Sequence, residues 1–229
     1  IGTPKLERDC GQVGSSPNLN RGSTRCDSRM KSRNEADHGV TLRSPTSRTG
    51  WSAPLTNWTI LSSSESLRRS PVTEAGGTFH FVMGPAGTFY NQAWTKKGDY
   101  KFSARVTQQK APSHPTSYGI AFGGANLADP NQTYTYFLVR QAGEFFISNR
   151  EGATTATQVN WTAHPAIQKQ TADGKQVNTL SVETKGAEVI FSVNGQEVKR
   201  LPKAGLHVDG LYGFRIGHNI DVDVDQVTR

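Results

Sequence analysis

The sequence predicts an all-β fold in which two antiparallel sheets pack as a sandwich, preceded by a disordered N-terminal tail. Three observations support this prediction. From residue 71 onward, short runs of alternating apolar and polar residues are separated by clusters of Gly, Pro, Asn and Asp, which is the pattern of strands joined by turns. No segment keeps a helical period of about 3.6 residues. Of the 20 aromatic residues, 18 lie after residue 70, where a core would need them.

The first 70 residues are interpreted as a disordered or non-native tail. Residues 1–50 contain no Phe, Trp or Tyr and are rich in Ser, Arg, Gly and Asn. They cannot bury enough apolar area to offset the entropy of ordering them. We therefore expect them to contribute nothing to the fold of residues 71–229, and we expect Cys10 and Cys26 to be free thiols. Trp58, Ile60 and Leu61 leave open an edge strand or a short cap on the domain.

Charge and composition narrow the possible functions. Residues 1–70 carry 11 Lys+Arg and 6 Asp+Glu, whereas residues 71–229 carry 15 and 13. The domain itself is near neutral, so we expect no nucleic-acid partner. With a mean hydropathy of −0.57 and no run of about 18 apolar residues, we expect no membrane insertion. Two cysteines exclude a disulfide-rich scaffold and a four-cysteine zinc site.

Eleven strands are predicted within the domain. In chain order they cover residues 78–83, 88–94, 100–106, 118–122, 134–139, 144–148, 178–184, 187–193, 196–201, 211–216 and 220–227. Asn194-Gly195 predicts a type I′ hairpin turn, because both residues tolerate a positive φ. A single open sheet of eleven or twelve strands would curl or split, so two packed sheets are expected.

One predicted strand has a special pattern. Residues 134–139 are apolar at both odd and even positions. Such a strand is either central and covered on both faces, or one whose second face is a binding surface. A groove along this strand would favour the second interpretation.

The domain resembles a known superfamily in six segments between Gly98 and the C-terminus: GDYKFSARV, YGIAFGG, YTYFLVRQAGEFFIS, VNWTAHPAI, NTLSVETKGAEVIFSVNGQEV and DGLYGFRIGHNIDVDVDQV. These segments are similar to the concanavalin A-like lectin and glucanase superfamily, and most of all to its laminin-G-like and keto-glycoside-hydrolase-like modules. The resemblance implies a jelly-roll sandwich over residues 71–229. The superfamily includes lectins, glycanases and adhesive modules, so it implies no single function.

Sugar binding needs exposed aromatic faces together with polar groups for the hydroxyls. In this superfamily the concave sheet supplies them. The candidate ligand-binding residues are Trp94, Tyr118, Tyr134, Tyr136, Arg140, Phe146, Trp161, His218 and Asn219.

Acidic residues offer weaker candidates. A glycosidase needs two carboxylates about 5–10 Å apart, and the E-x-D-x-x-E pattern of the superfamily's glycanases is missing from the sequence. One face of the last predicted strand carries three carboxylates, those of Asp221, Asp223 and Asp225. The alternatives for this acidic row are a solvated surface, a calcium site, or weak candidates for catalytic residues. Asp129 and Asn131 lie in a polar loop whose oxygen atoms suit Ca²⁺. No other cofactor is expected.

These observations favour a non-catalytic carbohydrate- or surface-binding module with a polysaccharide or glycan as partner, within a larger protein of several modules. The alternatives are a divergent glycoside hydrolase or keto-glycoside hydrolase, and a structural adhesion module without a small ligand. The chain begins with Ile and shows no apolar signal-peptide region, which is consistent with a fragment or a processed product. From the resemblance we expect a secreted, periplasmic or cell-envelope location.

Overall fold

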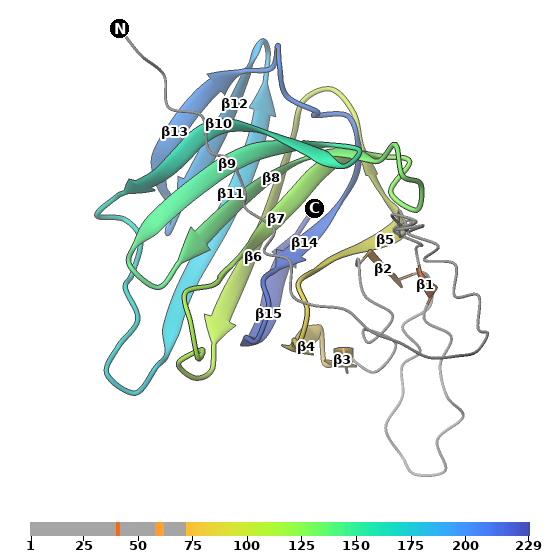
Figure 1. Cartoon of the computed structure of the whole chain (residues 1–229). Coiled ribbons are helices and arrows are strands. Elements are labelled where there is room, and N and C mark those ends of the chain that lie inside the picture. The colour runs from red at the N-terminus through yellow and green to blue at the C-terminus, as the bar shows by residue number, and fades with distance from the viewer. Residues whose placement is uncertain (1–39, 42–57, 62–71) are drawn as a thin grey trace, which may run out of the picture. The chain divides into compact units, whose positions relative to one another are not determined.

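The structure is a computed structural model that describes residues 40–41, 58–61 and 72–229. The described strands belong to one compact unit, Glu35–Arg229. They form two antiparallel sheets packed face to face, as predicted (Figure 1). The described residues contain no helix, and hence none long and apolar enough to cross a membrane.

The first sheet has eight strands. Their spatial order is β1 (Val40–Thr41), β2 (Trp58–Leu61), β5 (Gly87–Lys96), β14 (Gly210–Ile216), β7 (Ser117–Ala125), β8 (Thr133–Arg140), β9 (Glu144–Glu151) and β10 (Thr154–Ala163).

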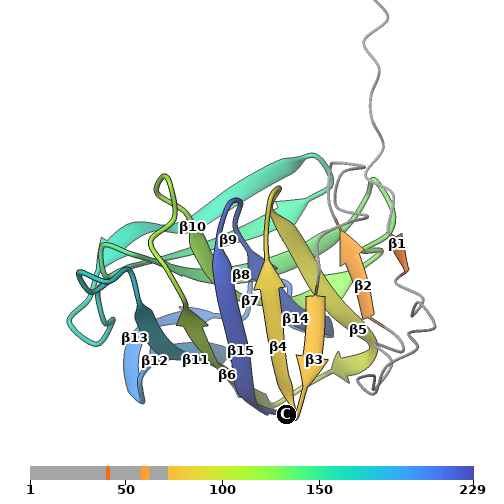
Figure 2. The same ribbon diagram turned by 90° about the horizontal axis from the view of Figure 1, so that it is seen from below.

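The second sheet has seven strands. Their spatial order is β13 (Gln196–Pro202), β12 (Glu188–Val193), β11 (Gln176–Lys185), β6 (Tyr100–Gln108), β15 (Asp221–Thr228), β4 (Thr78–Val82) and β3 (Val72–Ala75). Figure 2 shows these strands side by side in this order, with the eight-stranded sheet behind them.

The core lies between the sheets and is built from one parity of each strand. On β8, Phe137 and Val139 are fully buried and point inward, and Phe137 packs edge-on against Phe191 of β12 with ring centroids 5.3 Å apart. The other parity of β8, from Tyr136 to Arg140, faces away from the core. Burial of the inward aromatic side chains is the main favourable contribution to folding.

The hairpin turn predicted at Asn194-Gly195 is present in the structure. Asn194 and Gly195 join β12 to β13 with φ of 52° and 80°, as a type I′ turn requires. Asn194 also uses its side chain: its Oδ1 accepts a hydrogen bond from the Thr179 amide at 2.8 Å. The turn is thereby fixed to β11 as well as to its own hairpin.

The sheet begins before the predicted boundary at residue 71. β2 pairs with β5 from Trp58↔Asn91 to Leu61↔Thr88, so the edge strand that the sequence left open is present. β1 pairs with β2, which corrects the expectation that nothing before residue 50 takes part in the fold. Cys10 and Cys26, like most of the predicted tail, lie outside the described residues.

Candidate functional site

Small side chains on one central strand create a hollow in the outward face of the eight-stranded sheet. On β7, the residues Tyr118, Ile120 and Phe122 point into the core. The alternate residues Ser117, Gly119 and Ala121 point outward. Gly213 and Gly217 lie beside them on and after β14, where Gly217 donates its backbone N–H to the Ser117 carbonyl at 2.8 Å. Around Ser117 and Gly119, β7 therefore contributes no large side chain to this face, whereas Ala121 is covered by Tyr90, Leu127 and Tyr134.

The rows across the sheet show which residues border the hollow. One row runs Thr88, Arg215, Gly119, Leu138 and Phe146. The next row runs Ser117, Arg140 and Glu144. In both rows, larger side chains on β8 and β9 stand beside a small residue of β7.

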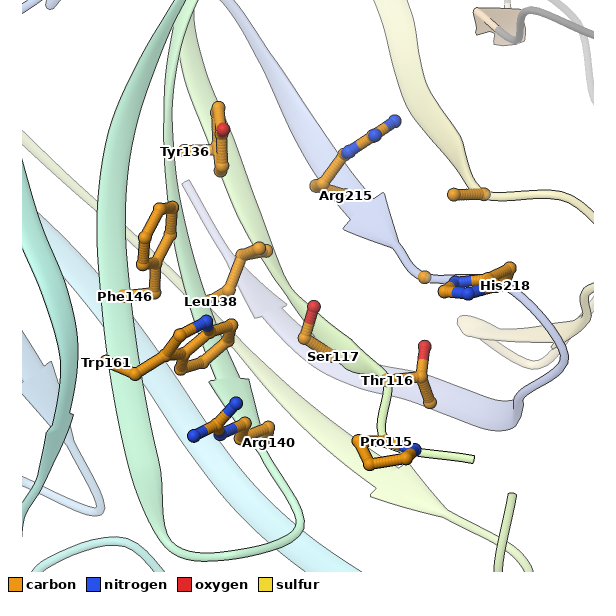
Figure 3. A pocket seen from close by; sticks show the side chains of 12 residues that line it. Pro115, Thr116, Ser117, Tyr136, Leu138, Arg140, Phe146, Trp161, Arg215 and His218 are labelled. Atoms are coloured by element: carbon orange, nitrogen blue, oxygen red, sulfur yellow. The ribbon is translucent and has the colours of Figure 1, made fainter. Parts of the chain in front are cut away.

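A pocket of about 340 Å³ lies along these rows. Its lining consists of Ala86, Pro115, Thr116, Ser117, Tyr136, Leu138, Arg140, Phe146, Trp161, Arg215, Gly217 and His218. Figure 3 shows Tyr136, Phe146, Trp161 and Arg140 along one side, with Arg215 and His218 along the other. The hydroxyl-bearing Thr116 and Ser117 lie between the two sides. The pocket thus has an aromatic wall, formed by Tyr136, Phe146 and Trp161, and a basic wall, formed by Arg215 and His218.

The aromatic wall is a continuous series of contacts. The rings of Tyr136 and Phe146 are 6.1 Å apart, and those of Phe146 and Trp161 are 5.1 Å apart with an interplanar angle of 30°. The guanidinium of Arg140 lies 4.4 Å from the centre of the Trp161 ring, within the range of a cation–π interaction. Its Nε donates to Glu144 Oε2 at 2.6 Å. This hydrogen bond lowers the pKa of Glu144 from its ordinary value.

A β-bulge explains how Trp161 reaches this wall. The pairing of β10 with β9 goes from Val159↔Ile147 directly to Thr162↔Phe145. Asn160 and Trp161 together therefore oppose Phe146. Asn160 satisfies the local backbone, since its Oδ1 accepts from the Trp161 amide at 2.8 Å. The extra residue allows Trp161, and not only Asn160, to share the face of Phe146.

The basic wall comes from β14 and the turn after it. Arg215 Nη1 donates to the Thr88 hydroxyl at 3.2 Å. The exposed His218 ring lies 4.4 Å from that of His114. Asn219, with φ of 50°, donates its backbone N–H to Gly84 O at 2.8 Å and does not line the pocket. The turn therefore fixes His218 at the rim.

Five of the nine sequence-predicted ligand residues meet at this pocket: Tyr136, Arg140, Phe146, Trp161 and His218. Tyr134 lies on the same face, with its ring 5.8 Å from that of Tyr136, but is only 4% exposed. The second face of β8 opens onto a hollow, as one of the two interpretations of residues 134–139 required.

Trp94 and Tyr118 do not belong to the site, and their assignment as ligand residues is corrected. Trp94 packs in the core against Tyr212, with ring centroids 5.5 Å apart. Tyr118 is fully buried and hydrogen-bonded to Gln176 and Asn178. Both residues are on the inward parity of their strands, so a ligand on the outward face cannot reach them.

The acidic row of β15 lies on the opposite sheet, away from the pocket. Its carboxylates are paired with basic side chains on neighbouring strands and loops: Asp221 with Lys110 at 3.0 Å, Asp223 with the His80 ring at 2.6 Å, and Asp225 with Arg105 at 2.6 Å. These pairs offset the repulsion between carboxylates two residues apart. The aspartates form a paired outer surface and do not meet the aromatic wall, so their weak assignment as catalytic residues is corrected.

The loop proposed for calcium has a structural use for its carboxylate. Asp129 Oδ1 accepts from the Asn131 amide at 2.8 Å, an Asx-type turn. Within the described part of the chain, no group of three or more His, Cys, Asp or Glu lies close enough to hold a metal ion.

Sequence reasoning missed Arg215 and the small residues of β7. A signal for Arg215 was present in GLYGFRI, where it is the charged residue of the parity opposite to Tyr212, Phe214 and Ile216. The strand that carries Trp161 was not predicted, because β10 is polar and largely exposed on both faces and shows no alternation.

No family model matches this chain, and no curated protein matches it either. Among solved structures, the carbohydrate-binding module CBM66 from Bacillus subtilis is similar with a TM-score of 0.57 and 11% identity, over 76% of this chain and 94% of that one. The GlcNAcα1-4Gal-releasing endo-β-galactosidase from Clostridium perfringens is similar with a TM-score of 0.50 and 9% identity, over 85% of this chain and 61% of that one. At such identities the likeness shows the fold alone, a two-sheet β-sandwich.

Proposed function

We propose that this chain is a non-catalytic carbohydrate-binding module of the concanavalin A-like superfamily, and that the pocket on the outward face of the eight-stranded sheet is its saccharide site. The observation that carries the proposal is the aromatic wall of Tyr136, Phe146 and Trp161 beside a hollow floored by small residues. Aromatic faces receive the apolar side of a pyranose ring. Hydroxyl and guanidinium groups around them supply hydrogen bonds to its polar edge.

The pocket gives less support to a hydrolase. Among its described lining residues none is Asp or Glu, whereas glycoside hydrolysis ordinarily uses two carboxylates across the scissile bond. The similarity to a carbohydrate-binding module supports binding at the level of the fold. A secreted or envelope protein with further modules is the setting that we propose for such a domain.

Replacing the central aromatic side chain tests this proposal. In Trp161→Ala, we expect the affinity for the bound polysaccharide to fall by about tenfold or more, or about 1.4 kcal/mol. The variant removes both the stacking surface and the support of Arg140. A glycan array identifies the ligand, and affinity electrophoresis of the full chain measures the loss.

The matched control is Val177→Ala, which trims a side chain that is 37% exposed on the outer face of the other sheet. Its binding should equal that of the unmodified chain. If the folded protein is retained by no polysaccharide, or if Trp161→Ala binds as well as the control, the pocket is not a saccharide site.

A further inference from the structure

The cations that line the pocket differ in how their charges are balanced. Arg140 is neutralised by Glu144 and covers the Trp161 ring. Arg215 has a different environment. Its hydrogen bond goes to the neutral hydroxyl of Thr88 at 3.2 Å, and it forms no ion pair with any described residue. A guanidinium stays protonated at all accessible pH values, so Arg215 brings a full positive charge to the rim of the hollow.

Arg215 lines the pocket on the side opposite the aromatic wall, and its guanidinium extends toward Thr88 of β5 (Figure 3). Arg215 is half-buried, and its neighbours across the sheet are Gly119, then Leu138, then Phe146. Adjacent strands are about 4.8 Å apart, so roughly 14 Å separates the backbone at Arg215 from that at Phe146. Gly119 has no side chain, so Leu138 is the one side chain that this row places between Arg215 and Phe146.

Acidic side chains are concentrated on the other side of the sandwich. Asp221, Asp223 and Asp225 lie on the outer face of the seven-stranded sheet, while the described lining of the pocket contains Arg140, Arg215 and His218. Residues 71–229 are near neutral in total, with 15 Lys+Arg and 13 Asp+Glu. Because Arg140 is paired with Glu144, the unbalanced positive charge of the described lining is that of Arg215, and it is a local feature and not a consequence of net charge.

From this arrangement we infer that the pocket selects an anionic saccharide, whose carboxylate or sulfate group binds Arg215 while its ring stacks on the aromatic wall. This inference rests on the proposed function and specifies the class of sugar. The planar fork of an arginine pairs with either oxyanion through two parallel hydrogen bonds. A partly desolvated charge without a counter-ion gains most from such a partner.

The test compares matched polymers that differ in charge. Affinity electrophoresis of the full chain would use polygalacturonate against its methyl ester, and dextran sulfate against dextran. We expect the charged member of at least one pair to bind at least about tenfold more tightly. The first pair reports on carboxylates and the second on sulfates.

Variants then assign the preference to a residue. Arg215→Gln should lose the preference for the charged polymer, and Arg215→Lys should keep part of it. The control Arg200→Gln removes an arginine of β13, in the other sheet, that pairs with Glu188 of β12 and Glu197 of β13. All variants keep residues 1–70, so attraction of polyanions to that basic segment is the same in each. Circular dichroism confirms that each variant is folded.

The outcomes separate this inference from the proposed function. Equal binding of charged and neutral polymers, with dependence on Trp161 retained, overturns the anionic specificity and leaves the saccharide site standing. The anionic specificity is also overturned if the preference for the charged polymer survives Arg215→Gln, or if Arg200→Gln reduces it as much as Arg215→Gln does. In either case the anionic group of the polymer would bind at another place on the protein. If no polymer binds in these assays or on the array, the proposed function fails and the inference with it.

Discussion

The hydroxyl group of Tyr118 connects the two sheets at one end of the sandwich. Tyr118 lies on β7, and its hydroxyl donates to Gln176 Oε1 at 3.1 Å and accepts from Asn178 Nδ2 at 3.2 Å, both on β11. Gln176 Nε2 in turn donates to the carbonyl oxygens of Arg140 and Gln168. Burial raises the pKa of Tyr118, so its hydroxyl stays neutral and available to both partners.

Tyr118→Phe tests this structural role. Removing the hydroxyl leaves the buried Gln176 Oε1 without its donor, which should cost about 1–3 kcal/mol of unfolding free energy. Urea denaturation measures the loss, and saccharide affinity in native buffer should not change. A variant that is as stable as the unmodified chain but binds sugar poorly would return Tyr118 to the site.

Single residues also show what sequence reasoning can and cannot predict about the site. Tyr136, Arg140 and Phe146 were predictable because residues 134–139 are apolar on both parities, which required a second occupied face. The aromatic ring of Tyr118 suggests a ligand residue, but Tyr118 alternates in phase with Ile120 and Phe122 and therefore points into the core with them. The contribution of Arg215 depends on its lack of a carboxylate partner among the described residues, and contacts between distant strands are not contained in a local pattern.

At the scale of the element, β7 provides the floor of the pocket. Its inward residues are large and its outward residues are Ser117, Gly119 and Ala121. A Cβ added at Gly119 would approach the Phe137 carbonyl oxygen to 2.0 Å, so this position cannot be enlarged without moving β8. Ser117 is half-buried and lines the pocket, so it is the floor position suited to substitution.

Ser117→Phe should fill the hollow. We expect saccharide binding to fall below detection, because the ring would occupy the space above β7. Stability should change by less than about 0.5 kcal/mol, as is usual for outward positions away from special contacts. The comparison is Ser181→Phe, on the outer face of β11 in the other sheet, for which affinity should be unchanged. Retained binding in Ser117→Phe would show that sugar does not enter this hollow.

The strands themselves were predictable to the extent that one face is buried. Alternation located β4 to β9 and β11 to β15 within a few residues of their observed ends. β10 and β3 were not predicted. The burial pattern of β10 is almost entirely exposed, and β3 has four residues. Edge strands bury too little to impose a period of two on their sequence.

At the scale of the whole molecule, the N-terminal boundary is the main revision. β2 pairs with β5 along its whole length, and Thr59, 2% exposed, lies opposite Tyr90, 3% exposed. Sequence patterns did not define this strand, because β2 has only four residues and its neighbours in the sequence are mostly polar. The stable domain therefore includes β2.

Two truncations test the boundary. Removing residues 1–34 should shift the thermal midpoint by less than about 2 °C, because every described strand lies within the unit Glu35–Arg229. Removing residues 1–61 should lower it by about 4 °C or more, because the β2–β5 pairing is lost and roughly 1 kcal/mol corresponds to 2–4 °C at this size. Scanning calorimetry measures both midpoints. Equal midpoints for the two truncations would place the boundary after β2.

The edge strands of both sheets affect whether the molecules aggregate at high concentration. An edge strand with a regular row of free backbone groups recruits strands of other molecules and begins aggregation. Here β3 is short, β13 carries Glu197, Lys199 and Arg200 and ends at Pro202, and β10 is interrupted by two register shifts. The bulge that aims Trp161 at the pocket thus also breaks the template along that edge. The outward face of the eight-stranded sheet can therefore bind a ligand next to β10, while the irregular β10 edge does not pair readily with strands of other molecules.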